Sequence, residues 1–127
     1  MTELADLLAL PDAATVRRAL ADYEALVEEA YGERFCGLYL FGSRARGTSR
    51  PDSDADIAVV LASFDGSALD EKMRLVDLAF DALTDRGLMI QPWPFTRDEW
   101  EGGEVSGRFA GLLAAARRDG AALATSP

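Results

Sequence analysis

Two short apolar runs lie near the middle of this sequence, between stretches of helical periodicity. The first run, 35–41 (FCGLYLF), ends at Gly42, and the second, 54–61 (DADIAVVL), begins with acidic residues. Runs of this length that are rich in β-branched and aromatic residues are typical of buried strands. Because neighbouring strands must cover their apolar faces, helices on either side of them indicate a small sheet with helices packed on it. The expected fold class is α/β or α+β, with a small mixed β-sheet flanked by helices.

Apolar residues at steps of four and three mark the two long helices. One helix is expected over 13–31, ended by Gly32, and a second over 69–86, ended by Gly87. The residues that share one face of the first are Val16, Leu20, Tyr23, Val27 and Ala30, and those of the second are Leu69, Met73, Val76, Phe80 and Leu83.

The remaining elements are shorter. A third strand is expected over 88–95, and its two prolines predict a place at the sheet edge. Thr96 then caps a turn through Trp100, with Glu99 in the capping-box position. A final helix is expected to begin near Val105 and Phe109 and to end near Gly120, and residues 1–10 are expected to form a short leading helix. Trp93 and Trp100 are expected to pack in the core or at its rim.

The length of 127 residues predicts a single domain, 1–127, in which 124–127 form a loose tail. The sequence contains no histidine, which excludes Ser-His-Asp triads, Cys-His pairs and zinc sites that use His. Any catalysis must therefore depend on carboxylates, hydroxyls, arginines, backbone N–H groups or metal ions with oxygen ligands. Lys72 is the one lysine.

The formal net charge of −9 argues against direct nucleic-acid binding, which depends on phosphate contacts. No apolar run is long enough for a membrane span, and no signal segment is visible. The lone Cys36 cannot form an internal disulfide, which fits a reducing cytoplasm, and it is expected to pack in the core.

The most informative chemistry lies between the two apolar runs. Gly42 and Ser43 are followed after ten residues by Asp54 and Asp56. A glycine at a strand end lets the backbone approach a phosphate, and the serine adds a hydroxyl and an N–H group. Two carboxylates two residues apart on a strand point to one face, where they suit Mg²⁺. Arg44 and Arg46, in the intervening loop, could neutralise phosphate charge.

The run 42–61 (GSRARGTSRPDSDADIAVVL) resembles the core motif of the DNA polymerase β-like nucleotidyltransferase superfamily, Gly-Ser followed after about ten residues by Asp-x-Asp. More narrowly, the chain resembles the minimal nucleotidyltransferases. Many of these short domains are encoded beside a helical HEPN partner as toxin–antitoxin pairs. The segments 88–100 and 110–123 are similar to later elements of that family.

The resemblance implies a polymerase β-like fold, triphosphate binding by Gly42 and Ser43, and metal binding by Asp54 and Asp56, with Ser43 and both aspartates as the catalytic residues. It also implies an Mg²⁺-dependent enzyme that transfers a nucleoside monophosphate, AMP from ATP, to a hydroxyl acceptor. The implied acceptor is a tyrosine of a HEPN toxin, so that the chain acts as the antitoxin.

One position departs from the family pattern. Family members often carry a third carboxylate on a later strand, and the corresponding polar residue here is Gln91, which cannot act as a base. The candidates to replace that carboxylate are Asp98, Glu99, Glu101 and Glu104. The departure leaves two alternatives open: an inactive module that neutralises a partner by binding, and a small-molecule nucleotidyltransferase of the antibiotic-modifying kind.

Overall fold

The computed structural model describes residues 13–42, 44, 54–102 and 110–122, and every structural statement below concerns this part of the chain. The expected leading helix 1–10, the start of the last helix at Val105 and Phe109, and the expected tail 124–127 lie outside it. The elements in chain order are α2 (Ala13–Tyr31), the 3₁₀ turn η1 (Gly32–Arg34), β1 (Phe35–Phe41), β2 (Ala55–Leu61), α4 (Ala68–Arg86), β3 (Ile90–Thr96), α5 (Arg97–Trp100), α6 (Ala110–Asp119) and β4 (Ala121–Ala122).

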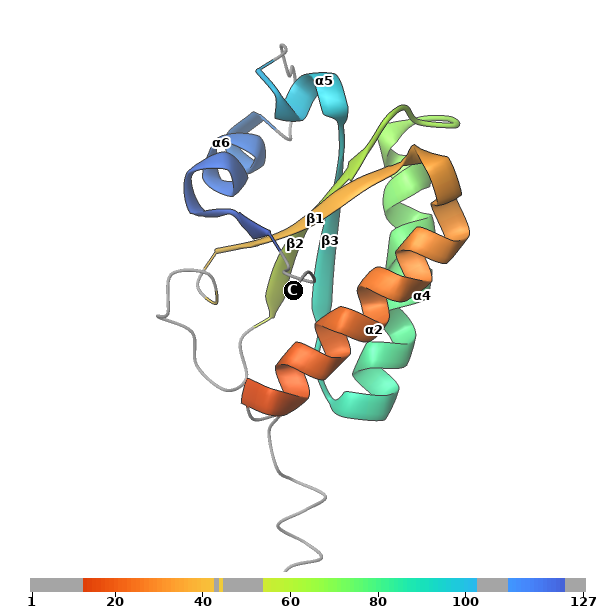
Figure 1. Cartoon of the computed structure of the whole chain (residues 1–127), viewed down its shortest axis with the longest axis vertical. Coiled ribbons are helices and arrows are strands. Elements are labelled where there is room, and N and C mark those ends of the chain that lie inside the picture. The colour runs from red at the N-terminus through yellow and green to blue at the C-terminus, as the bar shows by residue number, and fades with distance from the viewer. Residues whose placement is uncertain (1–12, 43, 45–53, 103–109, 123–127) are drawn as a thin grey trace, which may run out of the picture.

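The four strands form one mixed sheet in the order β3-β2-β1-β4 (Figure 1). β1 runs antiparallel to both β2 and β4, whereas β3 runs parallel to β2. The expected fold class, α+β with a small mixed sheet, is confirmed. β3 lies at the edge of the sheet, as its prolines predicted. β4 was not expected, because two alanines are too short to show a strand pattern.

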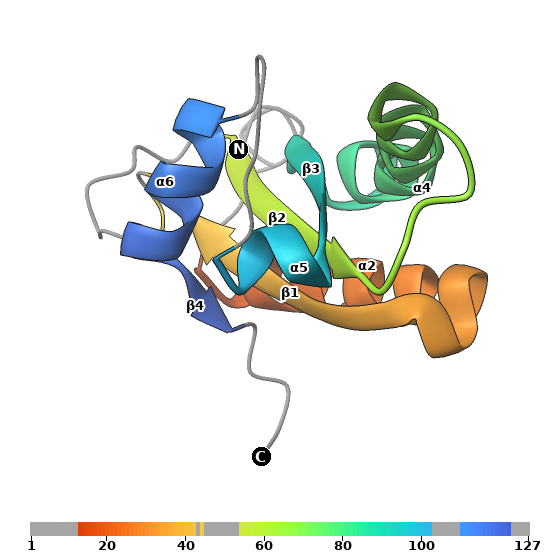
Figure 2. The same ribbon diagram turned by 90° about the horizontal axis from the view of Figure 1, so that it is seen from above.

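Helices cover both faces of the sheet. Figures 1 and 2 show α2 and α4 on one face, and α5 and α6 on the other. β2 is central and almost completely buried, so its side chains belong to the cores of both layers. Burying a side chain such as Ile57 or Val59 stabilises the fold by roughly 1.5–3 kcal/mol. Among the described helices, none is both long and apolar enough to cross a membrane.

The first long helix buries the face that its spacing predicted, with one exception. Val16, Leu20, Tyr23 and Val27 are buried on α2, as expected. Ala30 is instead exposed, and Tyr31 is buried in its place. Because an α-helix has 3.6 residues per turn, a stripe at steps of 3.5 residues drifts around the helix, and the next residue then reaches the core.

The second long helix turns its predicted apolar face to solvent. Leu69, Met73, Val76 and Phe80 are all exposed. The buried apolar face of α4 carries the smaller set Leu75, Ala79 and Ala82. The apolar residues that face the core therefore differ from those that the spacing predicted.

Cys36 does not pack in the core, contrary to the prediction. The pairing of β1 with β2 is irregular between Phe35 and Gly37, which leaves Cys36 without a partner in the ladder. Its half-buried Sγ accepts a hydrogen bond from Nη2 of Arg97, at 3.0 Å.

The short turn after β3 is built as predicted. Thr96 accepts a hydrogen bond from the N–H of Glu99 on its side chain, and the Glu99 carboxylate accepts one from the N–H of Thr96. This capping box fixes α5, and the ring of Trp100 stacks on that of Tyr39 with centroids 4.5 Å apart. The predicted packing role of Trp100 is therefore confirmed.

Candidate functional site

The end of β1 and the starts of β2 and β3 meet at one end of the sheet. Phe41, the last residue of β1, pairs with Asp56 near the start of β2, because the two strands are antiparallel. Asp56 also pairs with Gln91 near the start of the parallel strand β3. The end of β1, the start of β2 and Gln91 are therefore neighbours, although Gln91 follows Phe41 by 50 positions in the sequence.

Gly42 is required at its position for two reasons. Its φ of +76° is in the left-handed region, which side chains disfavour. A Cβ atom at this position would also lie 2.5 Å from Oδ2 of Asp56. The backbone at the end of β1 thus passes directly against the Asp56 carboxylate, and a larger residue would have to displace it.

Strand alternation is expected to direct the two aspartates to the same side of the sheet. Asp54 is exposed and Asp56 is half-buried, and Ala55 between them is wholly buried. The N–H of Ala55 donates to the carbonyl of Met89 at 2.9 Å, which anchors this strand end to the chain entering β3. Side chains alternate across a strand, so a buried Ala55 places its two acidic neighbours together on the open side.

Lys72 is a residue of this site that the sequence did not reveal. From α4 its Nζ donates to the carbonyl of Pro92 at 2.7 Å and lies 3.6 Å from the centre of the Trp93 ring. Burial lowers the pKa of Lys72, and the charge of Asp56 opposes that shift. A cation from a distant helix is therefore part of the electrostatic environment of Asp56. Its being the one lysine in the chain is a signal that could have singled it out.

The residues present fit a hard divalent cation. Asp54 and Asp56 offer carboxylate oxygens. Gln91, which pairs with Asp56 in the sheet, offers an amide oxygen. Mg²⁺ binds through one or two carboxylates while keeping water and substrate phosphates as its other ligands. The aspartate pair is therefore the candidate metal site; no group of three acidic, Cys or His ligands gathers within the described residues.

Residues of α5 cannot supply the third carboxylate. Asp98 and Glu99 follow the far end of β3, where Thr96 pairs with Leu61. Five residues of strand separate Gln91 from Thr96, a distance of about 17 Å. Glu99 is in addition committed to its capping box. Glu101 lies just beyond α5, on the same far side, and Glu104 lies outside the described residues.

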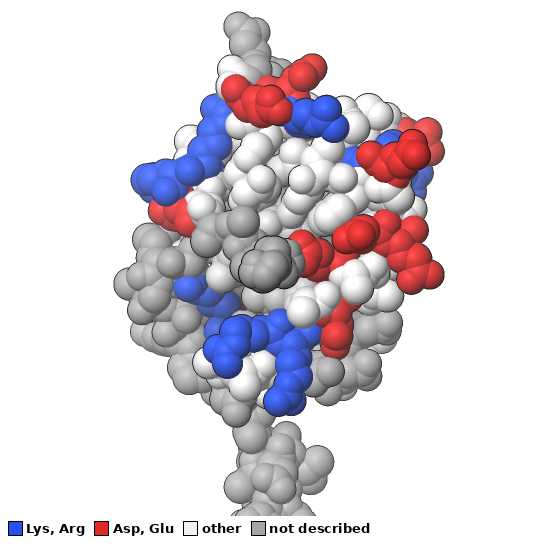
Figure 3. Space-filling view, in the orientation of Figure 1, with Lys and Arg blue, Asp and Glu red and all other residues white. Residues whose placement is uncertain are grey.

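The predicted phosphate-binding residues lie partly outside the described chain. Arg44 is half-buried and helical. Ser43 and Arg46 are not among the described residues, so their roles stay predictions. Arg17 and Arg18 are exposed on the first turns of α2, where Figure 3 shows basic side chains gathered. Acidic side chains gather instead over the later turns of the same helix, so positive charge is concentrated toward its start.

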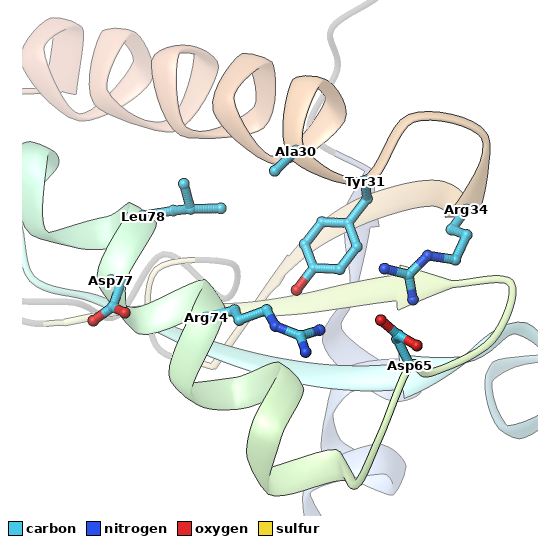
Figure 4. A pocket seen from close by; sticks show the side chains of 7 residues that line it. All are labelled: Ala30, Tyr31, Arg34, Asp65, Arg74, Asp77 and Leu78. Atoms are coloured by element: carbon cyan, nitrogen blue, oxygen red, sulfur yellow. The ribbon is translucent and has the colours of Figure 1, made fainter.

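A separate cavity lies at the opposite end of the sheet. It has a volume of about 440 Å³ and is lined by residues that include Tyr31, Arg34, Asp65 and Arg74 (Figure 4). Arg34 precedes β1 and Asp65 follows β2, so the cavity is remote from the aspartate pair.

Beside this cavity Glu71 is wholly buried and fully hydrogen-bonded. Its Oε1 accepts from the Tyr31 hydroxyl at 2.9 Å and from Arg74 at 2.8 Å. Its Oε2 accepts from the N–H of Asp65 at 2.7 Å and from Arg34 at 3.2 Å. Burial alone would raise the pKa of Glu71, but these donors outweigh it and hold the pKa below its ordinary value. Because Glu71 ties α2, η1 and the chain after β2 to α4, it stabilises the fold.

The family model of the nucleotidyltransferase domain matches residues 27–101, which contain the strand ends and both aspartates. The chain belongs to the nucleotidyltransferase family. No curated protein matches its sequence.

Two solved structures share the fold of this nucleotidyltransferase. One is described as a toxin–antitoxin with AMP-PNP; it is 17% identical, with a TM-score of 0.54 over 82% of this chain and 72% of that chain. The other is a mutant of the toxin–antitoxin MntA–HpeT in which two aspartates are replaced by glutamates. It is 13% identical, with a TM-score of 0.50 over 82% of this chain and 73% of that chain. At these identities the likeness shows a common fold.

Proposed function

We propose that this nucleotidyltransferase transfers AMP from ATP to a protein hydroxyl, the tyrosine of a HEPN-type toxin, and so acts as an antitoxin. The observation that carries the proposal is the contact of the Gly42 backbone with the Asp56 carboxylate, at a strand end shared with Asp54. The family membership supports nucleotidyl transfer. The toxin–antitoxin neighbours, one of them with an ATP analogue, support the nucleotide and the kind of partner.

Each residue of the site has a role in the proposed reaction. Gly42 and Ser43 hold the β- and γ-phosphates with backbone N–H groups and a hydroxyl, and Arg44 and Arg46 balance phosphate charge. Asp54 and Asp56 hold Mg²⁺, which when bound polarises the α-phosphoryl group and neutralises the leaving group. With Gln91 in the position of a third carboxylate, the two aspartates are the acidic ligands that the described residues offer to the site.

The chemistry balances as a simple displacement. The acceptor oxygen forms a bond to the α-phosphorus of ATP, and the bond from that phosphorus to the oxygen bridging to the β-phosphorus breaks. Pyrophosphate leaves with that electron pair, and the proton of the acceptor hydroxyl is released to solvent.

Label transfer from ATP to the partner tests the proposal. In Asp54→Asn/Asp56→Asn we expect transfer to fall roughly 100-fold or more, because the charge that holds the metal is lost. The matched control is Asp98→Asn/Glu101→Gln, which removes two exposed carboxylates at the far end of the sheet. That control should transfer at the wild-type rate. Equal transfer by wild type and the site variant would place catalysis elsewhere.

A binding module is the second candidate, and the register of Gln91 with Asp56 favours it. A neutral amide at this position weakens the donor set, and the module would then neutralise its partner by occlusion alone. Complete neutralisation of the partner by Asp54→Asn/Asp56→Asn, together with no heat of Mg²⁺-ATP binding to the wild type, would establish that the chain is a binding module.

A further inference from the structure

An uncovered apolar face runs along α4. Leu69, Met73, Val76 and Phe80, here named the α4 stripe, are 55, 53, 37 and 61% exposed. Their spacing of four, three and four residues places them on one face of the helix. The opposite apolar face, with Leu75 and Ala79, already serves the core. The stripe is therefore additional apolar surface that the fold does not use.

The surface exposed by these side chains is on the order of several hundred Å², a size that in monomers commonly marks an interaction site. α4 leads through Gly87 to Met89, another apolar residue that is 40% exposed. Met89 accepts the hydrogen bond of Ala55, which lies between Asp54 and Asp56. Exposed apolar side chains thus lie both along α4 and in the chain beside the aspartate pair.

The charges around the stripe are acidic. Met73 has Asp70 three residues before it and Asp77 four residues after it, both exposed neighbours on the helix surface. The described basic side chains of α4 are engaged elsewhere: Lys72 with Pro92, and Arg74 with Glu71. A partner that covers the stripe must therefore supply basic groups beside its apolar ones.

A second copy of the chain does not meet that requirement. Each copy carries a net charge of −9, and a symmetric contact would bring Asp70 and Asp77 near their counterparts. Strand addition beside the stripe is also disfavoured, since Pro92 and Pro94 of the edge strand β3 lack N–H groups. A helix with an apolar face, set into the stripe, needs no backbone donors from this chain.

We propose that the α4 stripe is the docking surface for a basic helical protein, which presents an apolar helix face and basic residues at its borders. Resting on the proposed function, this protein is the acceptor, and docking on α4 brings its hydroxyl to the aspartate pair past Met89. The stripe forms the apolar centre of the interface, and Asp70 and Asp77 form part of its polar rim.

Site-specific cross-linking identifies the occupant. The photoreactive residue p-benzoylphenylalanine replaces Phe80, or as a control Ala25 on the exposed face of α2, in the full chain produced in its native cells. We expect position 80 alone to cross-link to a basic helical protein that also acquires the AMP label. Cross-links to a second copy only, to an acidic protein, or to nothing would overturn the proposal.

Binding measurements with the purified, uncross-linked form of the protein that cross-linking identifies test the stripe itself. Met73→Glu/Phe80→Glu should weaken its binding roughly 100-fold or more, because interface centres dominate affinity. The control Ala21→Glu/Ala25→Glu adds the same two charges to α2 and should change binding less than about twofold. Asp70→Asn/Asp77→Asn should reduce the salt dependence of binding. Wild-type affinity in the stripe variant would refute the docking surface.

Mg²⁺-ATP titration separates docking from chemistry. The stripe variant should bind Mg²⁺-ATP like the wild type, while Asp54→Asn/Asp56→Asn should keep partner binding and lose transfer. If the stripe variant loses the partner but wild type transfers no label, docking stands and the proposed function fails. If the stripe variant transfers label at the wild-type rate, docking fails and the function stands.

Discussion

At the scale of single residues, Gly42 joins the fold to the site. It has a positive φ, and its backbone touches Asp56, so a side chain there would incur backbone strain and displace a carboxylate. Gly32 offers a matched comparison. Its φ is +58°, but a Cβ there would meet no atom within 4 Å.

Gly42→Ala and Gly32→Ala should therefore separate the effect of backbone strain from the effect of displacing the Asp56 carboxylate. Each should lower the free energy of unfolding by about 1–2 kcal/mol, the cost of a left-handed residue with a side chain. Gly42→Ala alone should also lower AMP transfer, roughly 10-fold or more, because it moves Asp56. Urea unfolding and label transfer measure the two effects. Equal transfer by both variants would show that the contact is unimportant.

Glu71 gives a pH dependence whose sign is fixed by its lowered pKa. The folded state holds this carboxylate charged, so its contribution to stability is present above the unfolded pKa of about 4.5. The contribution is lost as pH falls through the lower folded pKa. Glu71→Gln should lower the free energy of unfolding at pH 7 by about 2–3 kcal/mol, because buried and partly buried donors lose a charged partner.

The measurement is urea unfolding between pH 7 and pH 3. The wild type should lose stability on acidification more steeply than Glu71→Gln. Asp77→Asn, an exposed carboxylate on the same helix, serves as the control and should keep the wild-type profile. Parallel profiles for wild type and Glu71→Gln would contradict the role of the buried carboxylate.

At the scale of elements, the capping box at Thr96 orients α5. Thr96→Ala should lower the free energy of unfolding by about 1 kcal/mol, the usual loss for an N-cap. It should also loosen the stack of Trp100 on Tyr39, which near-ultraviolet circular dichroism detects. Thr84→Ala is the comparison, because the exposed Thr84 hydroxyl donates to the Phe80 carbonyl within α4. A greater loss of stability in Thr84→Ala would argue against the cap.

The sequence predicted where the helices and strands lie better than it predicted which face of each is buried. Apolar spacing located α2, β1, β2 and α4 within about two residues, because one face of each has to be buried. It could not show which of two apolar faces of α4 meets the sheet. That choice depends on how the helix packs in three dimensions: Leu75 and Ala79 are buried in the core, whereas Met73 and Phe80 are exposed.

The same limit applies to the candidate site. Gly42, Asp54 and Asp56 lie close together in the sequence, so a local motif could reveal them. Gln91 was placed on the right strand, and the sheet register sets it beside Asp56. Lys72 reaches this region only because α4 packs along β3, and no local pattern contains that information.

At the scale of the whole molecule, the aspartate pair and the Glu71 contacts occupy opposite ends of one sheet. Ligand binding and fold stability can therefore be measured separately. Mg²⁺-ATP at about 100 times its dissociation constant should stabilise the protein by about 2.7 kcal/mol, seen as a raised melting temperature. Glu71→Gln, though less stable, should show the same increment. Asp54→Asn/Asp56→Asn should show no increment. An undiminished increment in this variant would show that the nucleotide binds elsewhere.

The two prolines of β3 have a consequence for the behaviour of the free chain. An open strand edge is a template for amyloid-like growth, in which chains add to one another through backbone hydrogen bonds, but Pro92 and Pro94 of the edge strand are fully buried. Pro92 and Pro94 remove two of the donors that such growth requires, and Lys72 already occupies the carbonyl of Pro92. The protein can thus expose the apolar α4 stripe while its adjacent sheet edge resists the nucleation of fibrils.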